Sequence, residues 1–242
     1  MLPGHGEHAG RYAGLAMAMA AHDVATYALD VRGHGRSDGA RGHAMSWNDL
    51  VGDAVTFHTM VQAATSGEVV PLGHSVGGSI LLSAIVRGRL HPRRFIVSSP
   101  ALLVSARVPA WKATVGRGVS RLRPSLTMST ELNPEHISRD PAIVSAYRAD
   151  PLTHDKMSAR FYTEWQAANR EILERAHEIT MPFLATHGTD DRIIAVSGTE
   201  DLVSRASSAG KQLRLYAGGY HEPYNDINRQ EVYSDLARWL AA

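Results

Sequence analysis

The 242-residue sequence contains no cysteine, which excludes disulfides, thiolate metal sites and a cysteine nucleophile. No apolar run approaches the roughly 18 residues of a membrane-spanning helix, and no secretory signal follows Met1. Lys and Arg are scattered along the chain and the net charge is only +1. Nucleic acid is therefore not an expected partner. These absences favour a soluble, cytoplasmic protein.

Hydrophobic residues make up 44% of the chain, which is enough to form one globular core. Apolar patterns that alternate between strand and helix type predict a mostly parallel sheet flanked by helices. Strands are expected at 24–29, 69–73, 95–97, 183–186 and 212–216, and helices at 8–22, 47–64, 80–88 and from the last strand to Leu240. Between 101 and 180 prolines interrupt short amphipathic pieces, and no strand is obvious. We expect a core formed by 1–100 and 181–242, with 101–180 as a helical insertion.

The most informative motif is Gly73-His74-Ser75-Val76-Gly77, because it places a serine between an expected strand and an expected helix. A serine on such a sharp turn has strained backbone angles, and the glycines avoid a collision of Cβ atoms with the strand and helix. The turn predicts an exposed hydroxyl at a helix N-terminus. The alternative is a glycine- and serine-containing turn without catalytic meaning.

A serine nucleophile needs a base that is oriented by a carboxylate. Asp191 and His221 each follow an expected strand, and parallel sheets gather their sites at the carboxyl ends of strands. The order Ser75, Asp191, His221 is that of an α/β-hydrolase. Asp190 competes with Asp191 for the acid role.

The spacing of His5 and His8 suggests a metal, but no third ligand lies at a suitable interval. We expect instead a structural or oxyanion-loop role for these two histidines. No metal and no cofactor are expected.

Five segments together resemble the monoacylglycerol lipases of the α/β-hydrolase superfamily, and bacterial members look closest. These segments are Gly4-His5-Gly6-Glu7-His8-Ala9-Gly10-Arg11-Tyr12, Leu29-Asp30-Val31-Arg32-Gly33-His34-Gly35-Arg36-Ser37, the Ser75 motif, His187-Gly188-Thr189-Asp190-Asp191-Arg192 and Tyr220-His221-Glu222. Within the insertion, 138–141 and 147–152 also match, which identifies the insertion as the lid or cap. The likeness covers essentially the whole chain.

The resemblance implies hydrolysis of a monoacylglycerol through an acyl-enzyme on Ser75, with Asp191 and His221 completing the triad. By the same match, the backbone N–H groups of His5 and Val76 are the oxyanion donors. The partner is a small lipid ester, reached from a micelle or membrane surface. Candidates for an acyl tunnel in the cap are Leu126, Met128, Ile137, Ile143, Phe161 and Ile172.

The chain departs from the family pattern at its start, where only Met1, Leu2 and Pro3 precede Gly4. The family places a strand here, between the strands expected at 24–29 and 69–73. Pro71 is consistent with altered pairing, because proline cannot donate a ladder hydrogen bond. The chain is a fragment, or a truncation in which 24–29 and 69–73 pair directly, or a protomer completed in a homo-oligomer. We favour truncation with sheet repair or oligomerisation.

Two other kinds of function stay open. A short-chain carboxylesterase or a lysophospholipase uses the same triad. An idle α/β-hydrolase scaffold, used for ligand sensing, is an alternative of a different class.

Overall fold

Four parallel strands form the central sheet of the computed structural model, which describes residues 1–105 and 118–242. Their order in the sheet is β1-β2-β5-β6. The strands are β1 (Leu72–His74), β2 (Phe95–Ser98), β5 (Phe183–Gly188) and β6 (Lys211–Tyr216). The first three are buried along their whole length, as expected for parallel strands covered on both faces.

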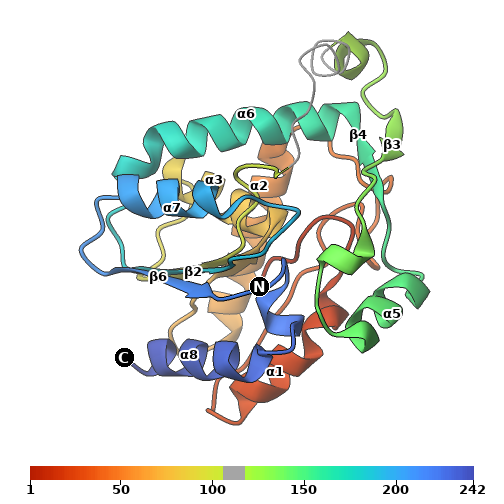
Figure 1. The fold of residues 1–242 in the computed structure, drawn as a ribbon. Helices are drawn as coiled ribbons and strands as arrows, with labels where there is room; N and C mark the ends of the chain where they lie inside the picture. Colours follow the sequence, from red (N-terminus) through yellow and green to blue (C-terminus); the bar gives the residue numbers. More distant parts are fainter. Residues whose placement is uncertain (106–117) are drawn as a thin grey trace.

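Helices cover both faces of this sheet, and each face has its own apolar cluster (Figure 1). On one face, Ile96 and Leu184 pack with α1 (Ala13–Ala20) and α8 (Arg229–Ala241). The other face carries α2 (Trp47–Ala64), α3 (Val76–Val86), α6 (Ala159–Arg175) and α7 (Val196–Arg205). The short helices are η1 (Ala9–Tyr12), η2 (Pro134–His136), η3 (Ala176–Glu178) and η4 (Pro223–Asn225), and 118–122 is also helical.

Most expected elements of the core are confirmed, including α2, which begins after the N-cap Ser46 and ends at Ala64 as predicted. The helix expected at 8–22 is divided into η1 and α1. The strand expected at 24–29 is wrong: the segment is extended, but belongs to no strand. Its apolar pattern favours a strand, but no strand of sufficient length lies beside it.

Met1 and Leu2 lie between residues 24–29 and β1 and are hydrogen-bonded to both. The N–H of Leu2 donates to the carbonyl of Leu72 at 2.8 Å, and the N–H of His74 donates to that of Leu2 at 3.0 Å. On the other side, the N–H of Leu29 donates to the carbonyl of Met1 at 3.1 Å. The predicted direct pairing of 24–29 with 69–73 is therefore wrong, because the first two residues separate them.

Next to Met1, between residues 24–27 and 64–72, lies a cavity of about 640 Å³. Its walls are mostly apolar and come from 24–27, 64–72 and the inner sides of α1, α2 and α8. The Met1 amino group donates to the carbonyl of Tyr27 at 2.6 Å, and burial lowers the pKa of this amino group to about 5.

The segment predicted as a helical insertion contains a small antiparallel pair, so the expectation that it lacks strands is wrong. β3 (Thr127–Ser129) pairs with β4 (Lys156–Ser158), and α5 (Pro141–Ala149) lies between them in sequence. Figure 1 shows β3 and α5 beside the core, whereas α6 crosses over it. Trp165 and Asn169 of α6 both donate to the carbonyl of Ala101. Part of the predicted insertion, 106–117, lies outside the described residues.

None of the helices that the structure describes combines the length and apolar character that crossing a bilayer requires.

Candidate active site

Ser75 lies at the turn from β1 into α3 with a left-handed φ of 52° and a ψ of −122°. A non-glycine residue is strained in this region, so the surrounding contacts must hold it there. A Cβ on Gly73 would lie 2.5 Å from the carbonyl oxygen of Gly77, and one on Gly77 would collide with the carbonyl of Leu2. These collisions explain both glycines of the motif and confirm its sharp turn.

The structure brings together the three side chains that the sequence places at separate strand ends. The Nε2 of His221 lies 3.0 Å from Oγ of Ser75, and its Nδ1 lies 2.7 Å from Oδ2 of Asp191. Asp191 follows β5 and His221 follows β6, which is next to β5 in the sheet. Parallel register therefore sets the acid and the base side by side. Asp190 is exposed, so Asp191 is the residue that faces the imidazole.

Each oxygen of Asp191 accepts two hydrogen bonds. Oδ1 accepts from the N–H groups of Ile193 at 2.8 Å and Ile194 at 2.9 Å, and Oδ2 is contacted by His221 and by His187 at 3.1 Å. Burial acts to raise the pKa of Asp191, but the two histidines outweigh it and hold the pKa well below its usual range.

The charge of Asp191 acts on the base in the opposite sense. Burial acts to lower the pKa of His221, but the Asp191 carboxylate outweighs burial and raises the pKa above its ordinary value of 6.5. A base with a raised pKa accepts a proton from a hydroxyl more readily, so the arrangement suits abstraction of the Ser75 proton.

The N–H groups of Val76 and His5 are the two predicted oxyanion donors. Val76 opens α3, and His5 lies in the loop Gly4-His5-Gly6, where a Cβ on Gly4 would lie 3.0 Å from Cβ of Ser75. Within residues 1–105 and 118–242, neither N–H donates to a backbone carbonyl. Among the described residues both N–H groups are thus without a backbone acceptor, and the loop that carries His5 packs against Ser75 at Gly4.

A buried ion-pair network holds the His5 loop in place. The Glu7 carboxylate accepts from the N–H of Gly4 and from the Tyr12 hydroxyl. Arg11 donates to Glu7 at 2.7 Å and to both oxygens of Glu222 at 2.6 and 2.8 Å. Since Glu222 follows His221, Arg11 joins the His5 loop to the loop of the base. The ring of Tyr147, on α5, lies 4.7 Å from the Arg11 guanidinium carbon.

His5 and His8 do not come together, so their spacing in the sequence does not form a shared site. His8 Nε2 contacts Asp150 at 2.8 Å, and its Nδ1 accepts from the N–H of Gly10. The ring of His5 points the other way, toward His34 and the carbonyl of Lys156. The structural role predicted for these histidines fits these contacts.

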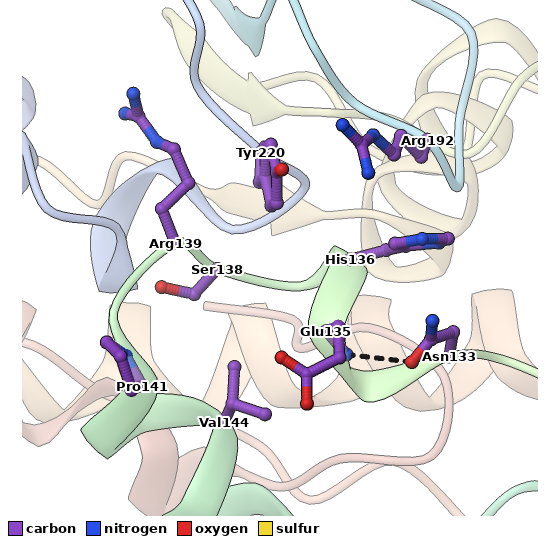
Figure 2. A pocket seen from close by; sticks show the side chains of 9 residues that line it. All are labelled: Asn133, Glu135, His136, Ser138, Arg139, Pro141, Val144, Arg192 and Tyr220. Carbon is purple, nitrogen blue, oxygen red and sulfur yellow. Dashed lines mark hydrogen bonds between the residues drawn. The ribbon is translucent and has the colours of Figure 1, made fainter.

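A pocket of about 400 Å³ lies where the insertion meets the triad loops. Figure 2 shows Tyr220 between Arg139 and Arg192, with His136 on the Arg192 side. The Arg192 guanidinium carbon lies 5.1 Å from the Tyr220 ring centre. Nearby, the N–H of Glu222 donates to the carbonyl of Ile137 at 2.9 Å. A backbone hydrogen bond therefore joins the insertion to the loop that carries His221.

Comparison with known proteins agrees with this geometry. The profile of the Hydrolase_4 family, described as "Serine aminopeptidase, S33", matches residues 1–228. The chain is 35% identical to the monoacylglycerol lipase of Mycolicibacterium smegmatis, over 99% of this chain and 86% of that protein. The chain belongs to the Hydrolase_4 family. This family is part of the α/β-hydrolase superfamily, as the sequence motifs indicated.

The likeness extends to a human protein and to a solved structure. Human monoglyceride lipase is 27% identical, over 98% of this chain and 80% of that protein. The crystal structure of the Paleococcus ferrophilus monoacylglycerol lipase matches with a TM-score of 0.89 and 29% identity, covering 99% of this chain and 92% of that one. The parallel sheet with flanking helices is thus the α/β-hydrolase fold.

Sequence reasoning missed two parts of this Hydrolase_4 site. His187 is fully buried at the end of β5, where it contacts Asp191 and the Thr199 hydroxyl. A histidine that ends a buried strand four residues before the acid was the available signal. The Arg11 pairing with Glu222 had no such signal, because the two residues are 211 positions apart.

Proposed function

We propose that this protein hydrolyses monoacylglycerols to glycerol and fatty acid, through an acyl-enzyme on Ser75. The observation that carries the proposal is the hydrogen-bonded series Ser75, His221 and Asp191, with separations of 3.0 and 2.7 Å. The substrate class comes from the lipases that are similar over nearly the whole chain.

In this mechanism His221 takes the Ser75 proton as the hydroxyl attacks the ester carbonyl, and then donates a proton to the departing glycerol oxygen. Asp191 keeps the imidazole in the required tautomer and stabilises the imidazolium. The N–H groups of Val76 and His5 bind the developing oxyanion, and such a donor typically contributes about 3–4 kcal/mol. His221 then activates water, which releases the fatty acid and restores Ser75.

The acyl chain is proposed to lie on the cap side of the His5 loop. Of the cap candidates, Phe161 has the strongest support, because its ring centre lies 4.9 Å from that of His5. Phe161 and Ile172 are both buried in the same apolar cluster, so it is the contact with the His5 ring, and not exposure, that favours Phe161. Ile137 is also buried, and Leu126 and Met128 are exposed.

Exposed apolar side chains on the cap support contact with a micelle or membrane surface. Leu122, Leu126 and Met128 are 86%, 46% and 66% exposed, and they lie within one short stretch of the chain. We propose that this stretch meets the lipid surface. Replacing Leu122 and Met128 with glutamate is expected to weaken cosedimentation with monooleoylglycerol vesicles, whereas unchanged binding would contradict the proposal.

Completion of the sheet in a homo-oligomer is supported by the apolar cavity of about 640 Å³ beside Met1. A molar mass above that of one chain, measured by light scattering during size-exclusion chromatography, is expected. A stable monomer would remove this proposal. The cytoplasmic location stays a prediction from the sequence.

The hydrolase proposal is tested by labelling and by substrate choice. A fluorophosphonate probe is expected to add one label to the wild type and none to the Ser75→Ala variant. The exposed Ser204→Ala change is the matched control, and should label normally. In parallel, unlabelled protein is assayed with monooleoylglycerol, p-nitrophenyl butyrate and lysophosphatidylcholine. Turnover of the butyrate alone would favour an esterase, and turnover of lysophosphatidylcholine alone a lysophospholipase.

A further inference from the structure

A second pair of a hydroxyl and an imidazole converges on the acid of the triad. Nε2 of His187 lies 3.1 Å from Oδ2 of Asp191, and Nδ1 of His187 lies 2.7 Å from Oγ1 of Thr199. Oδ2 is also the oxygen that lies 2.7 Å from Nδ1 of His221. Two series, each made of a hydroxyl, an imidazole and a carboxylate, therefore end on one oxygen atom.

The surroundings of Nε2 of His187 require a proton on this nitrogen. Besides Oδ2 of Asp191, it faces the carbonyl oxygen of Ile194 at 3.3 Å. An ionised carboxylate and a carbonyl only accept hydrogen bonds, so a lone pair on Nε2 would meet two acceptors and no donor. The Nε2–H group of His187 therefore donates to Asp191 whether the ring is neutral or charged.

The Thr199 hydroxyl serves the other nitrogen of this ring. Thr199 and His187 are both fully buried, so a hydroxyl hydrogen without an acceptor would be costly there. Among the described residues, Oγ1 of Thr199 has no hydrogen-bond partner except Nδ1 of His187. A neutral ring accepts this hydrogen at Nδ1. Thr199, on α7, thus orients an imidazole that belongs to β5.

The carboxylate of Asp191 is held in place without His187. Its Oδ1 accepts from the N–H groups of Ile193 and Ile194, which follow the acid in the same loop. The contact of His187 therefore acts on Oδ2 alone. An oxygen that accepts a second hydrogen bond attracts its first donor less strongly, because the added donor already stabilises part of the negative charge.

The other titratable and charged groups around His221 are held by separate contacts. Glu222 and Glu7 act to raise the pKa of His221, and both are paired with Arg11. The ring centre of His74 lies 5.0 Å from that of His221, and burial keeps the pKa of His74 well below 6.5. Among the described residues none of these groups is hydrogen-bonded to the second imidazole, so a change there leaves them in place.

We propose that His187 is a positioning residue that shares Oδ2 of Asp191 with His221, and so limits how strongly the acid attracts the base. The inference rests on the proposed function, since that function makes His221 the base. The direction of the expected change distinguishes sharing from a role in packing alone. Loss of packing would loosen the contact of Asp191 with His221 and lower the pKa of His221, whereas loss of a competing donor raises it.

The donor is tested first in the wild type, by ¹⁵N NMR of the histidine side chains in the full chain without substrate. At pH 7 a proton is expected on Nε2 of His187. A His187 ring that is protonated only at Nδ1 would overturn the proposal. This measurement needs no variant.

Two substitutions then test the effect on the base. His187→Leu removes the donor, whereas His187→Gln keeps an amide N–H near the position of Nε2. In the leucine variant the pKa of His221, followed by its ¹³Cε1 chemical shift, is expected to rise by about 0.5 pH unit, a fraction of what a hydrogen bond to a charged group is worth. In the glutamine variant it should stay near the wild-type value.

The exposed His177→Leu change is the matched control, and should leave the pKa of His221 unchanged. An unchanged or lowered pKa of His221 in folded His187→Leu protein would overturn the proposal. If the leucine variant does not fold, His187→Met, which also lacks the donor, replaces it.

The two proposals fail separately. Absence of Ser75 labelling by the fluorophosphonate probe would refute the hydrolase function, while the NMR measurements would still decide whether Oδ2 is shared. Failure of the pKa of His221 to rise would refute the sharing, and leave the hydrolase function standing.

Discussion

The two halves of the candidate site are held by different means. Ser75, Asp191 and His221 stand at the ends of three parallel strands, so backbone ladders set their separations. The His5 loop belongs to no strand of the described sheet, and it is held by the Glu7 and Arg11 side chains. The difference teaches that sheet register can place a serine beside a histidine, whereas the loop of the proposed oxyanion donor His5 is positioned by buried charges that are far apart in sequence.

The largest expected effect is on the strand-held half. Replacing Asp191 with asparagine leaves His221 in the wrong tautomer, so kcat is expected to fall by about 10⁴-fold. The assay is hydrolysis of p-nitrophenyl butyrate. Asp190→Asn is the matched control, since Asp190 is exposed in the same turn, and its kcat should stay within about twofold. Equal losses in both variants would contradict the assignment of Asp191.

The charge-held half should respond through stability. Arg11→Met leaves Glu7 and Glu222 buried without their shared cation, so the free energy of unfolding is expected to fall by about 3–5 kcal/mol. Urea unfolding followed by circular dichroism measures this change. The control is Arg89→Met at an exposed position. A loss below about 1 kcal/mol for Arg11→Met would show that the network contributes little to folding.

The pH dependence sharpens the comparison further, because the base belongs to the strand-held half. Protonated His221 cannot accept the Ser75 proton, and its pKa is raised, so kcat/KM should increase with pH with a midpoint above 6.5. The same raised pKa means that His221 stabilises the fold at low pH, and that this contribution is lost as pH rises through the raised value. A midpoint at or below 6.5 would refute the Asp191 effect on His221.

The smallest expected effect concerns the pocket where the insertion meets the loops of the strand-held half. Arg192→Ala removes a guanidinium that lies over the Tyr220 ring at an exposed site, so the unfolding free energy should change by less than about 1 kcal/mol. Thermal unfolding is a sufficient measurement. A larger loss would mean that Arg192 helps to place the neighbouring Asp191.

Sequence reasoning located the strand-held half because each residue follows a recognisable apolar strand. It could not predict that residues 24–29 form no strand, since their apolar pattern suits a strand whether or not a partner strand is present. The ladder of β3 and β4 was missed for a related reason. Three-residue strands in polar sequence carry no periodicity, and their pairing is decided by contacts about 30 positions apart.

The pairing of Arg11 with Glu222 could not be predicted either, because charged residues are usually exposed and nothing in the sequence indicates that these two are buried. The sequence-level prediction of the serine, acid and base nonetheless needed no side-chain contact. It rested on strand ends, which local patterns reveal.

The four hydrogen bonds that the Asp191 carboxylate accepts also affect how the protein responds to low pH. With both oxygens saturated, this carboxylate stays ionised far below the pH at which ordinary aspartates are neutralised. Its contribution to stability is therefore present above the unfolded pKa and lost only as pH falls through the depressed folded one. At any pH at which the chain stays folded and Asp191 stays ionised, protonation of His221 alone therefore decides whether the Ser75 hydroxyl can be deprotonated.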